Sequence, residues 1–354
     1  MAERYRKHVY CEKNFLEHCI KTIAEWKFCE QNFEELRLWM CIKSLIFSPD
    51  IVLHLDISDD DLPQFNGPKS QKVFSAWAIE LAQMQSEQKI HLKLGDFVTP
   101  ETINKSDNKQ LTAYYLTCAD CNTCQKCMDE CGVLAICPEN IKDFKSILYD
   151  NGSAIGKNEQ IAKDIRWKKY LNINPCNSLI LIDNYILQGT HYINNLESII
   201  DSILPKSLND NVIFQIFIFT ELKEFQQITK FYDEINILIR TKRPKLKFDL
   251  SLFKCNGCFH DRIIATNNVY ISCGSGFDIL GFNKEISRFN LISLKMTVLN
   301  ILFPFFPTDV KWGTMAYQNF EKESFSFTQK CNEYQGKDNV YNFYVGSKQN
   351  RLIE

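Results

Sequence analysis

Four cysteines in the middle of the chain have the spacing with which thiolates hold iron–sulfur clusters. Cys121, Cys124, Cys127 and Cys131 follow the pattern Cys-x2-Cys-x2-Cys-x3-Cys, and a Cys-Pro pair follows at Cys137. Four thiolates could also bind zinc, although structural zinc sites usually separate two close pairs of ligands by a longer loop. On a helix, the same spacing places Cys121, Cys124, Met128 and Cys131 along one apolar face. The run therefore indicates an iron–sulfur cluster, a zinc site or a buried helical face.

A phosphate site is indicated by His260 and Arg262. Positions two apart on a strand point to the same side of the sheet, so these side chains could converge on one phosphoryl group. A guanidinium fork matches phosphate oxygens bidentately, and an imidazole can act as a nucleophile. Ser275, in a Gly-Ser-Gly segment downstream, would add a hydroxyl group to this site. The structural alternative is a hydrogen-bonded core histidine, with Arg262 paired to Asp261 or Asp278.

These residues resemble the signature of the phospholipase D superfamily, which is His, any residue, Lys, four residues, then Asp. The likeness covers about residues 177–280, with His260 in the histidine position, Arg262 in place of lysine and Asn267 in place of aspartate. In that family the histidine attacks phosphorus and the lysine neutralises charge on the phosphoryl oxygens. Because a complete family site needs a second motif, the resemblance implies a homodimer that pairs two halves.

A closer resemblance is to the phospholipase D-like C-terminal domain of microtubule-interacting and trafficking proteins. That domain shares a His-Asp-Arg stretch and a Gly-x-Gly-hydrophobic-Asp segment with this chain. It binds lipid phosphate and does not cleave it. The resemblance implies anion binding without catalysis at His260 and Arg262.

The first part of the chain, at about residues 9–144, resembles the PIN-domain nucleases. A strand ending in Leu-Thr, the acid Asp120, a helix, Gly-Val, a short strand and Pro-Glu resemble the closing unit of that domain. Near the start, Glu12 takes the place of the first aspartate in an Asp-Thr-Asn triplet. PIN enzymes gather three or four carboxylates around Mg²⁺ or Mn²⁺, because hard cations take oxygen ligands. The resemblance implies Glu12 and Asp120 as metal ligands, with these candidate third acids: Asp56, Asp59 and Glu80.

The elements that position these residues fall into two groups. Periodicity predicts strands and helices in the first half, and the PIN-like closing unit favours a buried helical face for the cysteine run. From residue 178, strands at 178–182, 212–219 and 247–253 alternate with helices at 192–204 and 225–240, and Asn267-Asn268 predicts a hairpin turn. We therefore expect a two-domain α/β protein, with a PIN-like α/β/α domain at 1–148, a linker at 149–170, a phospholipase D-like α/β half with a mostly parallel sheet at 171–285, and an extension at 286–354.

Length and composition limit the functional classes. The 354 residues suit two domains, and 45% apolar with 24% charged residues is typical of a globular protein. Lys plus Arg number 41 against 43 Asp plus Glu, so any nucleic-acid contact must be a local patch. The N-terminus lacks a secretory signal and the apolar stretch 291–306 is too short for a membrane helix. We expect no membrane span and a cytoplasmic protein whose 15 cysteines are reduced.

Both resemblances concern phosphodiesters. Together they predict a nucleic-acid-targeting nuclease, or a nuclease-like subunit of a bacterial defence or toxin system, with Mg²⁺ or Mn²⁺ as its cofactor. A first alternative is a non-catalytic adaptor that binds a phosphorylated ligand at His260 and a protein partner through its aromatic C-terminal residues. A second alternative is an iron–sulfur protein, with zinc as the other thiolate-bound metal.

Overall fold

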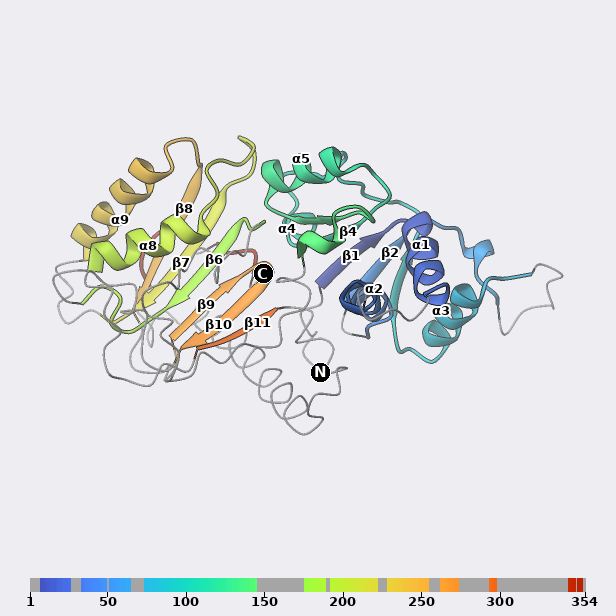
Figure 1. Ribbon diagram of the computed structural model, residues 1–354. Coiled ribbons are helices and arrows are strands. Elements are labelled where there is room, and N and C mark those ends of the chain that lie inside the picture. Colours follow the sequence, from blue (N-terminus) through green and yellow to red (C-terminus); the bar gives the residue numbers. More distant parts are fainter. Residues whose placement is uncertain are drawn as a thin grey trace. The chain divides into compact units, whose positions relative to one another are not determined.

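The structure is a computed structural model, and it describes residues 7–26, 33–49, 51–64, 73–144, 175–188, 192–221, 228–254, 262–273, 293–297, 343–347 and 349–352. The chain forms two compact units (Figure 1): Met1–Met128 with Val133–Tyr149, and Asp129–Gly132 with Asp150–Glu354. Strands and helices alternate in both, so the α/β class expected from the sequence is confirmed. The linker expected at 149–170 lies outside the described residues. Within the described part of the chain, no helix has the length and apolar character needed to cross a bilayer.

A five-stranded parallel sheet forms the first unit, in the order β3-β2-β1-β4-β5. Its strands are β1 (Lys7–Cys11), β2 (Ile51–Leu55), β3 (His91–Leu94), β4 (Tyr114–Leu116) and β5 (Leu134–Ile136). All pairings are parallel, so the carboxyl ends of the strands meet at one edge. The chain proceeds outward from β1 to β3 and then continues on the other side of β1 at β4. In open parallel sheets, ligands bind outside the carboxyl ends of the strands at such a reversal point.

Helices connect these strands: α1 (Lys13–Ala24), α2 (Phe33–Ile46), α3 (Ala76–Ser86), α4 (Asn108–Leu111) and α5 (Cys121–Cys131), with short 3-10 helices η2 (Asp59–Asp61) and η3 (Ile141–Phe144). Helix α1 is amphipathic, because Phe15, Leu16 and Cys19 lie on its buried side. The ring of Trp39 in α2 is 5.8 Å from that of Phe15, so the two helices pack directly.

The second unit contains a seven-stranded sheet in the order β11-β10-β9-β6-β7-β8-β12. Its strands are β6 (Ser178–Ile182), β7 (Phe214–Thr220), β8 (Phe248–Lys254), β9 (Arg262–Thr266), β10 (Val269–Cys273), β11 (Ser293–Thr297) and β12 (Phe343–Val345). The β9–β10 hairpin turns at Asn267-Asn268, as expected. Only β6–β7 and β7–β8 are parallel among the described pairings, so the expectation of a mostly parallel sheet is wrong and the sheet is mixed. Antiparallel partners add to both sides of the parallel centre, two of them from the range 286–354 expected to be an extension.

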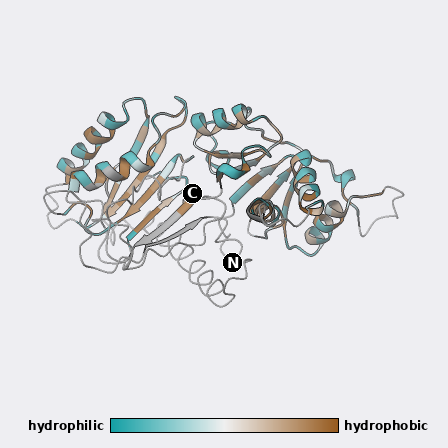
Figure 2. Ribbon diagram, viewed as in Figure 1, coloured by the Kyte–Doolittle hydropathy of each residue, from teal (hydrophilic) through white to brown (hydrophobic). Residues whose placement is uncertain are grey.

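The core of the second unit lies between the central strands and two helices, α8 (Tyr192–Ile203) and α9 (Ile228–Lys242). Every residue of β6 and β7 is buried, which explains their nearly continuous apolar sequences. In Figure 2 these strands are mostly brown, whereas α8 and α9 mix teal with brown. The apolar side of the helices contributes Leu196, Ile199, Ile235 and Ile239 to the core.

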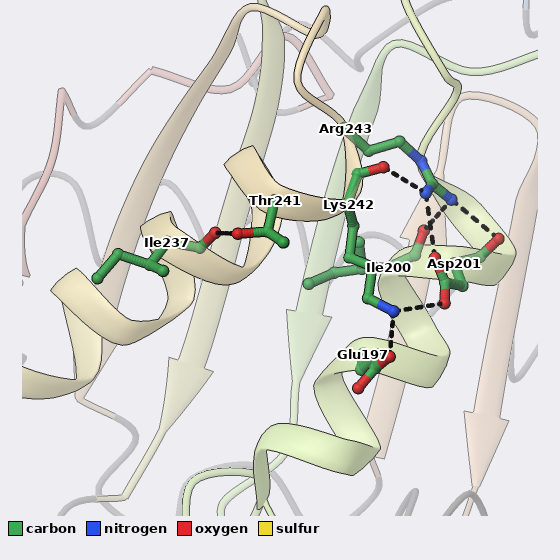
Figure 3. Close-up of polar contacts among 7 residues, drawn as sticks. All are labelled: Glu197, Ile200, Asp201, Ile237, Thr241, Lys242 and Arg243. Atoms are coloured by element: carbon green, nitrogen blue, oxygen red, sulfur yellow. Dashed lines mark hydrogen bonds and ion pairs between the residues drawn. The ribbon is translucent and has the colours of Figure 1, made fainter.

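Arg243, directly after α9, caps the C-terminal end of α8 (Figure 3). Its guanidinium donates to the backbone carbonyls of Ile200 at 3.2 Å and Asp201 at 3.1 Å. It also donates to the carbonyl of Leu204 at 2.9 Å. It also pairs with the Asp201 carboxylate at 3.0 Å, and the neighbouring Lys242 ammonium contacts Glu197. The last carbonyls of a helix lack partners within it, so these bonds fasten the end of α8 to α9.

The C-terminal residues 350 and 351 lie inside the second unit. Arg351 is 4% exposed and donates to the carbonyl of Asn177 at 2.9 Å and to that of Ile213 at 2.9 Å. The side chain of Asn350 accepts from the Ser178 hydroxyl at 2.8 Å and donates to the Leu179 carbonyl at 3.2 Å. These two side chains bond to the ends of β6 and β7 and to the residues beside them.

Candidate functional site

Glu12 lies at the carboxyl edge of the first sheet, at the reversal between β1 and β4. It directly follows β1, and its backbone N–H donates to Leu116 of β4 at 2.9 Å. Its carboxylate accepts the Thr117 hydroxyl at 2.5 Å and the Cys118 N–H at 2.6 Å. Thr117 follows β4, so the residues after two neighbouring strands hold this carboxylate in a fixed position. In the position of the Asp-Thr-Asn triplet, Glu12 is the residue whose carboxylate is held in this way.

Asp56 stands at the same edge, directly after β2. Its Oδ1 accepts the backbone N–H of Lys13, at the start of α1 and next to Glu12, at 2.5 Å. Both carboxylates act on the exposed thiol of Cys118, whose pKa is raised by partial burial first and then by the charges of Glu12, Cys137 and Asp56. The other two candidate third acids lie elsewhere, Asp59 in η2 and Glu80 on the exposed face of α3. Asp56 is therefore the acid that accompanies Glu12.

Asp120 caps the N-terminus of α5. Its Oδ1 accepts the N–H groups of Asn122 at 2.8 Å and Thr123 at 3.0 Å, and its Oδ2 accepts the Thr123 hydroxyl at 3.0 Å. The hydrogen bonds from Thr123 lower the pKa of Asp120. The expected metal ligand is thus a helix cap as well, with Oδ2 keeping most of its acceptor capacity.

The expected metal clusters are not preassembled in the described residues. No three or more His, Cys, Asp or Glu side chains within this part of the chain are grouped so that they could hold an ion. That finding covers both the carboxylates Glu12 and Asp120 and the four evenly spaced cysteines. Any metal at these positions would need ligands from elsewhere, such as water or a substrate.

The cysteine run forms helix α5, and most of its thiols are buried. Cys124, Cys127 and Cys131 are 0%, 4% and 2% exposed, in line with a helical face that packs in the core. Cys121 departs from this pattern, because it is partly exposed and its Sγ lies 3.6 Å from that of Cys137. A hydrogen bond to Glu139, followed by partial burial and contact with Cys137, raises the pKa of Cys121 to about 12. Burial likewise raises the pKa of Cys124 well above its usual range.

Two of the expected phosphate-binding residues, His260 and Ser275, lie outside the described residues, but Arg262 is described. It begins β9, whose antiparallel register with β6 sets Ile263 opposite Ile182 and hence Arg262 opposite Asp183. The Arg262 Nε atom is 4.0 Å from Asp183 Oδ1, and its guanidinium lies 5.3 Å from the ring centre of Tyr185. The Asp183 carboxylate is fully buried, so it balances much of the charge that Arg262 would offer to a phosphate.

Asn267 has a structural role in the hairpin between β9 and β10. Its side-chain oxygen accepts the backbone N–H groups of Asn177 at 2.9 Å and Ser178 at 3.1 Å, and its amide donates to Asn177 Oδ1 at 3.0 Å. Asn267 is 4% exposed. These bonds join the hairpin to the start of β6 and account for an amide at this position.

Sequence reasoning missed Asp183 as the ionic partner of Arg262. The expected partners, Asp261 and Asp278, are close in sequence and lie outside the described residues. A signal was present, because Asp183 is an acid that directly follows a wholly apolar strand, where a buried charge needs a partner. Thr117 was also seen only as part of a strand, although it is the residue that orients Glu12.

Comparison with known protein families gives no matching family, and comparison with curated proteins gives no significant match.

Proposed function

We propose that the first unit is a metal-dependent phosphodiesterase acting on nucleic acid, either as a nuclease or as a nuclease-like subunit of a bacterial defence or toxin system. The observation that supports this proposal is the pair of carboxylates Glu12 and Asp56 at the carboxyl ends of neighbouring parallel strands, beside the reversal point. Two acids at such an edge provide oxygen donors where open parallel sheets bind ligands.

The donor set fits Mg²⁺ or Mn²⁺ better than a thiolate-bound metal. Mg²⁺ is usually held by one or two carboxylates, with water and substrate phosphate oxygens completing its shell, so a protein cage of three ligands is not required. Glu12 and Asp56 would hold the ion, and water and substrate oxygens would complete its shell. When bound, such an ion polarises the phosphoryl group and lowers the pKa of a coordinated water molecule.

The residues around Glu12 support the proposal because they hold its carboxylate in place. The Thr117 hydroxyl and the Cys118 N–H fix one rotamer of the carboxylate, which reduces the reorganisation needed when a charged ligand arrives. Asp56 bonded to the first N–H of α1 is held in the same way. Glu12 is half-buried and Asp56 is exposed, so both carboxylates remain accessible to a polyanionic substrate with its counterions.

The test is cleavage of RNA, single-stranded DNA and double-stranded DNA by the purified chain with Mn²⁺ or Mg²⁺. Glu12→Gln and Asp56→Asn should each reduce the rate about 100-fold or more, because each removes a charged ligand of the ion that polarises the phosphoryl group. Glu101→Gln, an exposed acid in another loop, is the matched control and should keep full activity. Equal activity in all variants, or no cleavage of any nucleic acid with either metal, would contradict the proposal.

The two alternative functions give different results in the same preparation. Metal analysis by mass spectrometry of anaerobically purified protein would find iron if the chain is an iron–sulfur protein and zinc if thiolates bind zinc. An adaptor would bind a phosphorylated ligand without cleaving nucleic acid. The ion pair between Arg262 and Asp183 reduces the free positive charge for such a ligand, so the phosphodiesterase is the function we favour.

A further inference from the structure

The thiols of Cys121 and Cys137 form a close pair that the proposed function does not use. Cys121 is the first residue of α5 and Cys137 directly follows β5, so two elements bring the thiols together at the carboxyl edge of the first sheet. Their Sγ atoms are 3.6 Å apart. A disulfide bond is about 2.0 Å long, so this is a contact between two reduced thiols that need a short movement to bond.

The two thiols differ in exposure. Cys137 is buried in the first unit, whereas Cys121 is partly exposed. The Cys121 thiol also has a hydrogen-bond partner in the carboxylate of Glu139, an exposed residue two positions after Cys137. A reagent from solution therefore reaches Cys121 first, and the buried Cys137 sulfur lies 3.6 Å from the Cys121 sulfur.

We propose that Cys121 and Cys137 are a site of thiol–disulfide exchange with low-molecular-weight disulfides, such as oxidised glutathione. Cys121 loses its proton to solvent, and its thiolate attacks one sulfur of glutathione disulfide, from which one glutathione leaves as a thiolate. The Cys137 sulfur loses its proton to solvent and then attacks the Cys121 sulfur, which releases the second glutathione. Two protein thiols lose two electrons in total, and one glutathione disulfide becomes two thiols.

The other thiols of the run do not offer this arrangement. Cys127 and Cys131 are buried on the core side of α5, where solution disulfides do not reach them. Cys124 is buried as well, although its thiol interacts with Cys137. Cys118 is exposed, but the described residues show no sulfur–sulfur contact between it and Cys137 like the 3.6 Å contact of Cys121. The spacing of Cys121, Cys124, Cys127 and Cys131 does not reveal the relevant pair, because the second thiol, Cys137, comes after β5.

The experiment treats the native full-length protein with oxidised glutathione, alkylates the remaining thiols and maps the peptides by mass spectrometry. Cleavage after Lys126 places Cys121 and Cys137 on different peptides, and because each peptide holds two further cysteines, fragmentation of the linked pair identifies the bonded residues. We expect the loss of two free thiols and a Cys121–Cys137 link. Cys121→Ser should abolish the link, whereas Cys118→Ser should leave it unchanged.

Cys137→Ser provides a second and independent readout. Without the second thiol the exchange stops half-way, so Cys121 should retain one glutathione that dithiothreitol removes. This variant is compared with the wild type by circular dichroism to verify its fold. A link between other cysteines, a glutathione adduct on wild-type Cys121 that does not resolve, or no thiol loss at all would overturn the proposal.

Discussion

A pair of histidines on neighbouring strands of the first sheet has lowered pKa values. His8 Nδ1 and His54 Nε2 are 2.8 Å apart across β1 and β2, and the Tyr10 ring stacks on His54 with a centroid distance of 4.2 Å. Burial, followed by the charges of His8 and Lys93, lowers the pKa of His54 to about 4. The pKa of His8 is also lowered, by burial first, then by Lys93 and Lys109, with Asp107 opposing them.

We expect the first unit to lose stability as the pH falls from about 6.5 to about 4. The unfolded chain binds a proton at His54 near its ordinary pKa, whereas the folded unit resists protonation until about pH 4, so acid favours unfolding in this window. The free energy of unfolding should fall by about 2 kcal/mol. Urea unfolding at a series of pH values measures the slope. His54→Gln should remove most of it, and an unchanged slope in that variant would contradict the assignment to His54.

Asn267 marks the limit of what residue patterns reveal. Its distance from His260 in sequence suggested the position of a catalytic aspartate, and nothing nearby indicated otherwise. Its hydrogen-bond partners, Asn177 and Ser178, are about ninety positions earlier and become neighbours only when β9 pairs with β6. Contacts between distant segments decide the role of such a residue, so spacing alone could not predict it.

At the scale of elements, the sequence predicted the strands and helices with strong periodicity. The range 178–182 is predicted as a strand, and β6 has these bounds. Strand β3 was missed because its residues His91, Leu92, Lys93 and Leu94 are partly polar and few. It is a strand because β2 pairs with it, which is tertiary information.

The cap on α8 leads to a prediction about one helix end. Arg243→Met should destabilise the second unit by about 2–3 kcal/mol, because three helix carbonyls and the Asp201 carboxylate lose a charged donor. Hydrogen exchange should speed up in the last turn of α8. Arg240→Met, one turn earlier on the exposed side of α9, is the matched control and should change stability by less than about 0.5 kcal/mol. Similar losses in both variants would show that general charge, and not the cap, is responsible.

At the scale of the whole chain, segments far apart in sequence complete the second sheet. Its parallel centre, β6-β7-β8, was predictable from alternating strands and helices. Its edge strands β11 and β12 were not, because they come from a range without clear alternation and join the sheet through antiparallel pairing with β10 and β8. The mixed character of the sheet follows from these late additions.

Arg351→Ala should destabilise the second unit and leave the first unchanged. The substitution leaves the carbonyls of Asn177 and Ile213 without their charged donor inside the core, at an expected cost of about 3 kcal/mol. Hydrogen exchange should rise in β6 and β7 but not in β1 and β2. Gln349→Ala, an exposed neighbour, is the control. If Arg351→Ala does not fold, Asn350→Ala tests the same attachment while keeping the charged donor, and wild-type exchange in the variant that folds would contradict it.

The attachment of Arg351 to β6 and β7 also bears on the order of events during synthesis. A ribosome releases the strand β6 more than 150 residues before it releases Arg351, and the polar groups that this side chain satisfies stay open to water until then. The centre of the second sheet can collapse early, but its final bonds form only after translation has passed residue 351. A chaperone that shields nascent chains would therefore be needed for the longest time at this sheet.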